Sequence, residues 1–183
     1  MVDKKELRKI ILEKRDSIDL SERIKYDEEI FNSVINSPQY NEAKCIFIFV
    51  SYKTEVNTHE IIKKALSQGK RVCVPKVLSK SEGMYAVEIK KYDDLKSGKY
   101  GILEPENFEN KINEEEIDLA LIPGVAFDKN GGRMGYGAAF YDRFLIKLKK
   151  DTPKIALAYE MQIVDYIPMN EWDVKVDGII TNG

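Results

Sequence analysis

The chain has 183 residues and a formal net charge of −2; 43% of its residues are hydrophobic and 33% are charged. This length and composition are typical of one soluble globular domain with a sizeable core, so we expect a single domain over residues 1–183. The near-neutral charge lacks the excess of basic residues that nucleic-acid-binding proteins show. Because neither a signal peptide nor an apolar run of ~20 residues is found, we expect a cytoplasmic protein without a membrane partner.

The first predicted element is a helix over residues 3–15, in which apolar residues recur at helical spacing. Asp3 and Glu6 resemble a capping box at its start. Lys4 and Arg8 stand four residues apart, so they project from the same side of the helix. Spacing alone predicts a solvated basic face for such a pair.

A second helix is predicted over residues 21–35, and a continuous apolar run at residues 45–50 predicts a strand that is covered on both faces. Tyr52 and Glu55 follow this strand at its carboxyl end, where open α/β sheets bind their ligands. A third helix is predicted over residues 57–68. Because Glu55 stands just ahead of that helix, its position also fits a surface carboxylate favoured by the helix dipole.

Residues 70–75 predict the next strand and complete a strand–helix–strand unit of the parallel type. Alternation at residues 84–89 predicts a shorter strand with one wet face, and the polar residues 107–116 indicate an exposed connection.

Cysteine and histidine are scarce, and their positions indicate packing rather than chemistry. Cys45 and Cys73 each lie in an apolar strand-like run, which favours buried free thiols over a disulfide or a metal pair. The sole histidine, His59, falls in the first turn of a predicted helix, where we expect a surface or packing residue. A chain with one histidine disfavours a histidine-based triad and a histidine-rich zinc site.

The richest stretch of the chain joins a strand, a glycine-rich loop and a helix. Residues 118–122 predict a buried strand, five glycines follow between residues 124 and 137, and helical spacing begins at residue 138. Backbone N–H groups in such a loop can approach an anion, and a helix start adds partial positive charge. Arg133 lies in the loop and Asp142 one turn into the helix, so a phosphate with a divalent cation would use both.

Spacing alone leaves an anion site and a structural turn equally open, because both the Walker pattern and the complete dinucleotide fingerprint are missing. Further strands are predicted at residues 154–158 and 178–181. The alternation of strands and helices predicts an α/β fold, with a mostly parallel central sheet in a single domain and helices on both faces.

Residues 123–144 read PGVAFDKNGGRMGYGAAFYDRF, which resembles the signature of the 5-formyltetrahydrofolate cyclo-ligase (methenyltetrahydrofolate synthetase) family, roughly PG-x-AFD…G-x-RLGYGGGYYDR. The Lys-Glu-Leu-Arg opening at residues 5–8, the Ser-Tyr-x-x-Glu-Val-x-Thr run at residues 51–58 and the Gly-Ile-x-Glu-Pro segment at residues 101–105 are also similar to family segments. The match over residues 123–144 is long and specific.

The sequence departs from the family pattern at two places. Residues 138–140 read Ala-Ala-Phe where the family often has Gly-Gly-Tyr, and Trp172 replaces a histidine that commonly precedes the closing acidic residue, here Asp173. Alanine is a better helix former than glycine by ~1 kcal/mol per residue, and Phe140 keeps the aromatic ring. We therefore expect the first departure to be compatible with function.

The resemblance implies an ATP-dependent ligase that turns 5-formyltetrahydrofolate into 5,10-methenyltetrahydrofolate, with ADP and phosphate as products and Mg²⁺ as cofactor. It implies phosphorylation of the formyl oxygen followed by ring closure through N10, carried out by a monomer acting on small molecules. The implied ATP-binding residues are Lys4, Lys5, Arg8, Arg133, Gly135, Gly137 and Tyr141. The implied folate-binding residues are Tyr52, Glu55, Tyr136 and Phe140, the metal ligands are Asp142 and Asp173, and the catalytic candidates are Arg133 and Tyr136.

Two other classes of function stay open on the sequence alone. One is a different α/β enzyme, of the sugar-phosphate isomerase or coenzyme-A transferase type, which would share the sheet and the anion loop but act without ATP. The other is a nucleotide-binding regulatory module without turnover, which is favoured if the Ala-Ala-Phe departure at residues 138–140 prevents catalysis.

Overall fold

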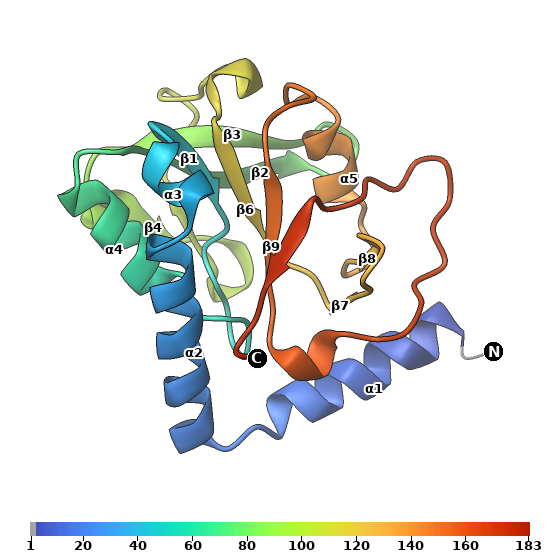
Figure 1. Ribbon diagram of the computed structural model, residues 1–183. Coiled ribbons are helices and arrows are strands. Elements are labelled where there is room, and N and C mark those ends of the chain that lie inside the picture. The colour runs from blue at the N-terminus through green and yellow to red at the C-terminus, as the bar shows by residue number, and fades with distance from the viewer. Residues whose placement is uncertain (1–2) are drawn as a thin grey trace.

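The computed structural model describes residues 3–183 and is built on a six-stranded sheet with the order β10-β9-β6-β1-β2-β3 (Figure 1). Neighbouring strands pair in parallel except for β3 (Gly83–Ile89), which pairs antiparallel with β2. The parallel strands are β1 (Cys45–Ile48), β2 (Arg71–Ser79), β6 (Leu119–Ile122), β9 (Lys154–Leu157) and β10 (Gly178–Ile180). The predicted mostly parallel sheet is confirmed.

Helices cover both faces of the sheet, as predicted (Figure 1). One face packs against α2 (Leu20–Ile35), α3 (Pro38–Glu42) and α4 (His59–Ser67). The opposite face packs against α5 (Phe140–Leu145). The first helix, α1 (Lys4–Asp16), instead crosses below β7 and β8, next to the edge where the parallel strands end.

Successive side chains of a strand point to opposite faces of the sheet, so the core residues of each strand divide between these two layers. On β1, Ile46 and Ile48 join the cluster that contains the α2–α4 side chains, while Phe47 joins the cluster under α5. The rings of Phe47 and Phe144 lie 4.6 Å apart between centroids. Because every residue of β1 is buried, the strand reads as a continuous apolar run rather than an alternating one.

Smaller elements complete the chain. Two short hairpins are formed by β4 (Leu95–Ser97) with β5 (Leu103–Pro105) and by β7 (Ala126–Phe127) with β8 (Arg133–Met134). Single 3₁₀ turns are η1 (Tyr92–Asp94), η2 (Lys99–Gly101), η3 (Glu114–Glu116) and η4 (Glu160–Gln162). No helix within residues 3–183 has both the length and the apolar content needed to cross a bilayer.

Three local predictions need correction. The side chain of Asp3 makes no capping bond to the part of the chain that the structure describes, so the capping box is absent there. Strand β3 has no wet face, because Ala86 packs in the core layer under α5 and Ile89 in the layer under α4. Its outer edge is covered by residues 110–112, where the Ile112 N–H donates to Ala86 O at 3.0 Å, so the connection predicted to be exposed is partly built into the fold.

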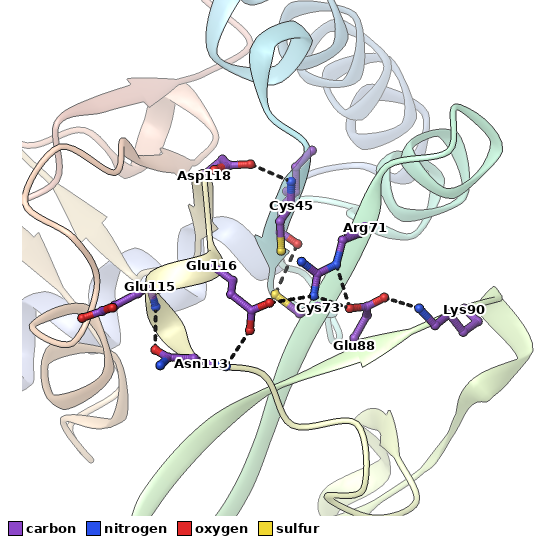
Figure 2. Close-up of polar contacts among 10 residues, drawn as sticks. Cys45, Arg71, Cys73, Glu88, Lys90, Asn113, Glu115, Glu116 and Asp118 are labelled. Atoms are coloured by element: carbon purple, nitrogen blue, oxygen red, sulfur yellow. Dashed lines mark hydrogen bonds and ion pairs between the residues drawn. The ribbon is translucent and has the colours of Figure 1, made fainter.

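The amino ends of the central strands are tied together by a charged network (Figure 2). The Arg71 guanidinium donates to the Glu88 carboxylate at 2.7 Å and to Glu116 at 3.2 Å, and Lys90 contacts Glu88 from the other side. Burial raises the pKa of Glu88, but the bonds from Lys90 and Arg71 outweigh it and hold that pKa below its ordinary value. Asp118 accepts the N–H of Cys45 at 2.9 Å and so joins β6 to β1.

Both cysteines are buried and free, which confirms the sequence prediction. The Cys73 thiol donates to Ile46 O at 3.4 Å, and burial raises its pKa well above the ordinary value (Figure 2). His59 is a packing residue, because its ring nitrogens lie 2.8 Å from the Tyr92 hydroxyl and 2.9 Å from Ser51 O.

The β7–β8 hairpin is fastened by one buried carboxylate, that of Asp128. Its Oδ1 accepts the N–H groups of Asn130 and Gly132, both at 2.9 Å, and its Oδ2 accepts the N–H of Ile167 at 2.7 Å. The side chain is 2% exposed. Asp128 therefore joins the hairpin that carries Arg133 to the distant C-terminal segment.

We expect Asp128→Ala to lower the free energy of unfolding by about 3 kcal/mol, because three backbone donors lose their common acceptor in a buried setting. Urea unfolding monitored by circular dichroism measures the change. The exposed Asp151→Ala is the matched control and should shift stability by less than about 0.5 kcal/mol. A loss below about 1 kcal/mol for Asp128→Ala would show that solvent replaces the carboxylate.

Candidate functional site

A cavity of about 340 Å³ opens at the edge where the parallel strands end. It is lined by the start of α1, the glycine-rich loop, α5 and part of the C-terminal segment. Three of its lining residues are cations, Lys4, Arg8 and Arg133, and two are carboxylates, Asp142 and Asp173. The fold thus brings together charged residues from both ends of the chain.

Helix α1 places Lys4 and Arg8 in the cavity, one turn apart. Arg8 Nε donates to Gly135 O at 3.0 Å, which ties the helix to the glycine-rich loop. Lys4 Nζ lies 3.6 Å from Asp173 Oδ2. Lys5, the other lysine of the predicted anion site, is exposed, and Lys4 is the lysine that lines the cavity.

Arg133 forms part of the cavity wall beneath the loop. It is 6% exposed, and its Nε donates to Pro123 O at 2.8 Å. Its Nη1 lies 4.0 Å from Asp142 Oδ1, and its guanidinium stacks on the Tyr141 ring at 5.1 Å from the centroid. Burial lowers the pKa of Arg133, an effect that Asp142 opposes. A guanidinium keeps its charge at any working pH, so it presents a fixed cation to the cavity.

The backbone of the glycine-rich loop needs small residues at two positions. A Cβ at Gly135 would lie 3.1 Å from Arg133 Nη2, so Gly135 allows the guanidinium to lie directly against the loop. Gly137 has φ +107°, a region that favours glycine. Both glycines line the cavity.

The helix predicted from residue 138 starts only at Phe140, because Ala139 adopts the left-handed conformation with φ 57°. Both alanines precede the helix, so the prediction that Ala138 and Ala139 are compatible with function because alanine favours a helix is based on a wrong assignment. Arg143 supports this turn by donating to Ala139 O at 3.3 Å and by stacking on Phe140 at 5.2 Å. Phe140 and Tyr141 both line the cavity.

Asp142 and Asp173 are the two carboxylates available for a cation. Asp142 Oδ1 accepts the N–H of Val174 at 3.0 Å, and Asp173 Oδ2 accepts the N–H of Asn170 at 2.9 Å. Across residues 3–183, no group of three or more metal-ligating side chains is assembled. A cation such as Mg²⁺ commonly takes one or two carboxylates and completes its shell with phosphate oxygens and water, so these two side chains are the ones in the cavity that could hold it.

A second polar cluster adjoins the cavity and centres on Glu55. Tyr52 N–H donates to Glu55 Oε1 at 2.8 Å, and the Tyr136 hydroxyl donates to Oε2 at 3.1 Å. Burial raises the pKa of Glu55, which Tyr52 N–H, Arg15 and Tyr136 oppose. Burial and the Glu55 charge raise the pKa of Tyr136 to about 12. Tyr136 also lines the cavity, so it joins the two halves of the site.

Sequence analysis did not single out Arg15, which donates to the Tyr136 hydroxyl at 3.0 Å. A usable signal existed, because residues 4, 8 and 15 fall on one helical face. Asn170, which also lines the cavity, carried no comparable signal.

Comparison with known proteins identifies one family. The model of the 5-formyltetrahydrofolate cyclo-ligase family matches residues 1–182. A probable 5-formyltetrahydrofolate cyclo-ligase of Caenorhabditis elegans is 35% identical over 98% of this chain and 93% of its own length. The 5-formyltetrahydrofolate cyclo-ligase of Mus musculus is 32% identical over 97% and 92%.

Two solved structures are similar throughout. The 5,10-methenyltetrahydrofolate synthetase of Aquifex aeolicus superposes with a TM-score of 0.86 at 31% identity, over 98% of this chain and 89% of that one. The 5,10-methenyltetrahydrofolate synthetase of Mycoplasma pneumoniae gives a TM-score of 0.81 at 29% identity, over 100% of both chains.

We expect Ala139→Gly to stabilise the protein by about 0.5–1 kcal/mol, because relief of left-handed strain exceeds the entropy that glycine adds to the unfolded chain. Ala138→Gly is the matched control. Ala138 has no positive φ, so only the entropic term applies there and the variant should lose up to about 1 kcal/mol. Thermal unfolding measures both signs, and equal losses in the two variants would contradict strain at Ala139.

Proposed function

Since the chain belongs to the 5-formyltetrahydrofolate cyclo-ligase family, we propose that it converts 5-formyltetrahydrofolate into 5,10-methenyltetrahydrofolate, with ATP cleaved to ADP and phosphate. The observation that carries this proposal is the composition of the cavity. Three cations and two carboxylates meet there beside a glycine-rich loop, which is a suitable set for polyphosphate accompanied by a divalent cation.

The chemistry explains why such a site suffices. A formamide carbonyl is a poor electrophile, so the terminal phosphoryl group of ATP is transferred to the formyl oxygen. N10 then attacks the formyl carbon, the carbon–oxygen bond breaks, and phosphate leaves with that oxygen. N10 loses its proton as the ring closes. These steps need positioning and charge neutralisation rather than a protein nucleophile, in keeping with two cysteines that are buried away from the cavity.

Each part of the site has a role in this scheme. Lys4 and Arg8 hold the phosphates of ATP in the ground state, and the backbone of residues 135–137 lies along them. Arg133, fixed by Pro123 O, neutralises the phosphoryl group as it moves. The reduced folate lies beside Tyr136, where its N–H groups can donate to Glu55, with Tyr52 and Phe140 as aromatic walls.

The cation of the reaction would be Mg²⁺, held by Asp142 and Asp173, the two carboxylates of the cavity. When bound, Mg²⁺ neutralises negative charge on the phosphates of ATP. The side chain of Asp173 is also paired with Lys4, so Lys4 can turn from the carboxylate to a phosphate when the nucleotide enters.

The test is a direct assay of the purified chain with 5-formyltetrahydrofolate, Mg²⁺ and ATP, in which the methenyl product is detected by its chromophore. We expect the chromophore only when ATP is present. Formation without ATP, or nucleotide binding without any chromophore, would overturn the proposal and favour an ATP-independent enzyme or a regulatory module, respectively.

We expect Arg133→Ala to lower kcat by roughly 10²–10³, because it removes a preorganised donor whose interaction strengthens in the transition state. Arg8→Ala should mainly raise the KM for ATP. Steady-state profiles with ATP varied at saturating folate separate the two effects. Because Arg133 also bonds Pro123 O, melting curves must first show that the variant is folded. An unchanged kcat with a raised KM for ATP would mean that Arg133 binds the ground state and the transition state equally strongly.

We expect Asp142→Asn to raise the Mg²⁺ concentration needed for half-maximal activity, because the neutral amide is a weaker ligand for a hard cation. Titration of Mg²⁺ at fixed ATP measures the shift, with the exposed Asp151→Asn as control. An unshifted Mg²⁺ curve would limit Asp142 to its contacts with the Val174 N–H and the Arg133 guanidinium.

A further inference from the structure

We propose that Arg15 is a positioning residue for folate recognition, which holds the Tyr136 hydroxyl and, through it, the carboxylate of Glu55. This inference rests on the proposed function and concerns a residue that lies outside the cavity lining. It is argued from the bonds of a buried cation near the end of α1.

Arg15 is a buried cation whose hydrogen-bond partners are hydroxyl groups. It is 4% exposed. Its Nε donates to Thr54 Oγ1 at 3.1 Å and its Nη1 to the Tyr136 hydroxyl at 3.0 Å. The ion pairs found among residues 3–183 do not include Arg15. A charge buried in this way is costly unless its bonds are well placed, so the position of the guanidinium is strongly specified.

Arg15, Tyr136 and Glu55 form a chain of hydrogen bonds in which each group donates to the next. A tyrosine hydroxyl has one proton, and Tyr136 gives it to Glu55 Oε2 at 3.1 Å. It can therefore accept from Arg15, which has only donors. Without Arg15 the hydroxyl loses the partner that sets its orientation, and Glu55 keeps a fixed bond only to Tyr52 N–H at 2.8 Å.

Arg15 is itself held from a second helix. Arg23 of α2 donates through Nη2 to Arg15 O at 2.5 Å and through Nη1 to Thr54 O at 2.7 Å. One side chain, that of Arg23, therefore holds both the backbone of Arg15 and the backbone of its partner Thr54. A rigid support of this kind keeps a binding group within the narrow tolerance that recognition requires.

Arg15 also acts on the charge of Glu55. The groups that face Glu55 are Arg15 from α1, Tyr52 N–H and Tyr136 from two loops, and Tyr141 from α5, whose own pKa the Glu55 charge raises. Of these, Arg15 is the cation. An opposite charge lowers the pKa of a carboxyl, so loss of Arg15 raises the pKa of Glu55 and reduces its ionised fraction at a given pH. The ionised form is the better acceptor for folate N–H donors.

The experiment compares Arg15→Gln, Arg15→Lys and the exposed control Lys14→Gln in the chromophore assay, over the pH range in which each variant is folded. We expect Arg15→Gln to raise the KM for 5-formyltetrahydrofolate about tenfold or more, while the KM for ATP changes less than about twofold. The acid limb of kcat/KM for folate should move to higher pH. Arg15→Lys keeps the positive charge, so its acid limb should lie at the wild-type pH, but its KM for 5-formyltetrahydrofolate should stay between those of the wild type and Arg15→Gln. Lys14→Gln should match the wild type in both quantities.

A double-mutant cycle separates positioning from simple structural support. If Arg15 acts through Tyr136, Arg15→Gln should add little to the folate KM in a Tyr136→Phe background. Equal rises in both KM values, full additivity, or an unmoved acid limb would overturn the inference. If Arg15→Gln does not fold, Tyr136→Phe alone must still raise the folate KM selectively, and its failure to do so counts against the proposal. Absence of chromophore in the wild type would instead refute the proposed function.

Discussion

The packing of α1 against the β7–β8 hairpin is the contact on which the site depends. A helix of 13 residues is marginal by itself in water, and this one is held by tertiary contacts. Ile11 packs with Val125, Ala126 and Met134, and Arg8 bonds Gly135 O. The same helix then presents Lys4 and Arg8 to the cavity and Arg15 to the Tyr136 hydroxyl. Any change that loosens this packing removes three cations from the site at once.

Tyr136 connects the cavity with the Glu55 cluster. Its place in the cavity wall puts it next to the proposed phosphate region, while its hydroxyl belongs to the Glu55 cluster. A reaction in which one substrate phosphorylates the other requires two binding regions that share a boundary. In the proposed reaction, the tyrosine between Gly135 and Gly137 would supply that boundary, on a loop whose shape is restricted from beneath by Arg133.

The sequence predicted the sheet, its mostly parallel pairing and the glycine-rich loop, because these depend on local patterns of apolar and glycine residues. It did not reveal the distant bonds of Asp128 and Arg15, because Asp128 accepts from Ile167, 39 residues away, and Arg15 donates to Tyr136, 121 residues away. The left-handed turn at Ala139 was also missed, since alanine in that position carries no local signal. The motif resemblance placed Lys4, Arg8, Arg133, Asp142 and Asp173 in one site, and all five line one cavity. Their individual roles remain predictions.

The reaction of the buried thiols in the central sheet with an added reagent reports on unfolding of the protein. A thiol-specific alkylating reagent needs contact with a thiolate, and Cys45 and Cys73 are 2% and 0% exposed, on two adjacent strands of the sheet. Alkylation can therefore proceed only through openings that separate β1 from β2, and its rate reports how often the most protected part of the fold opens. For the same reason, oxidants that inactivate enzymes with exposed thiols have no ready target among the cysteines of the folded chain.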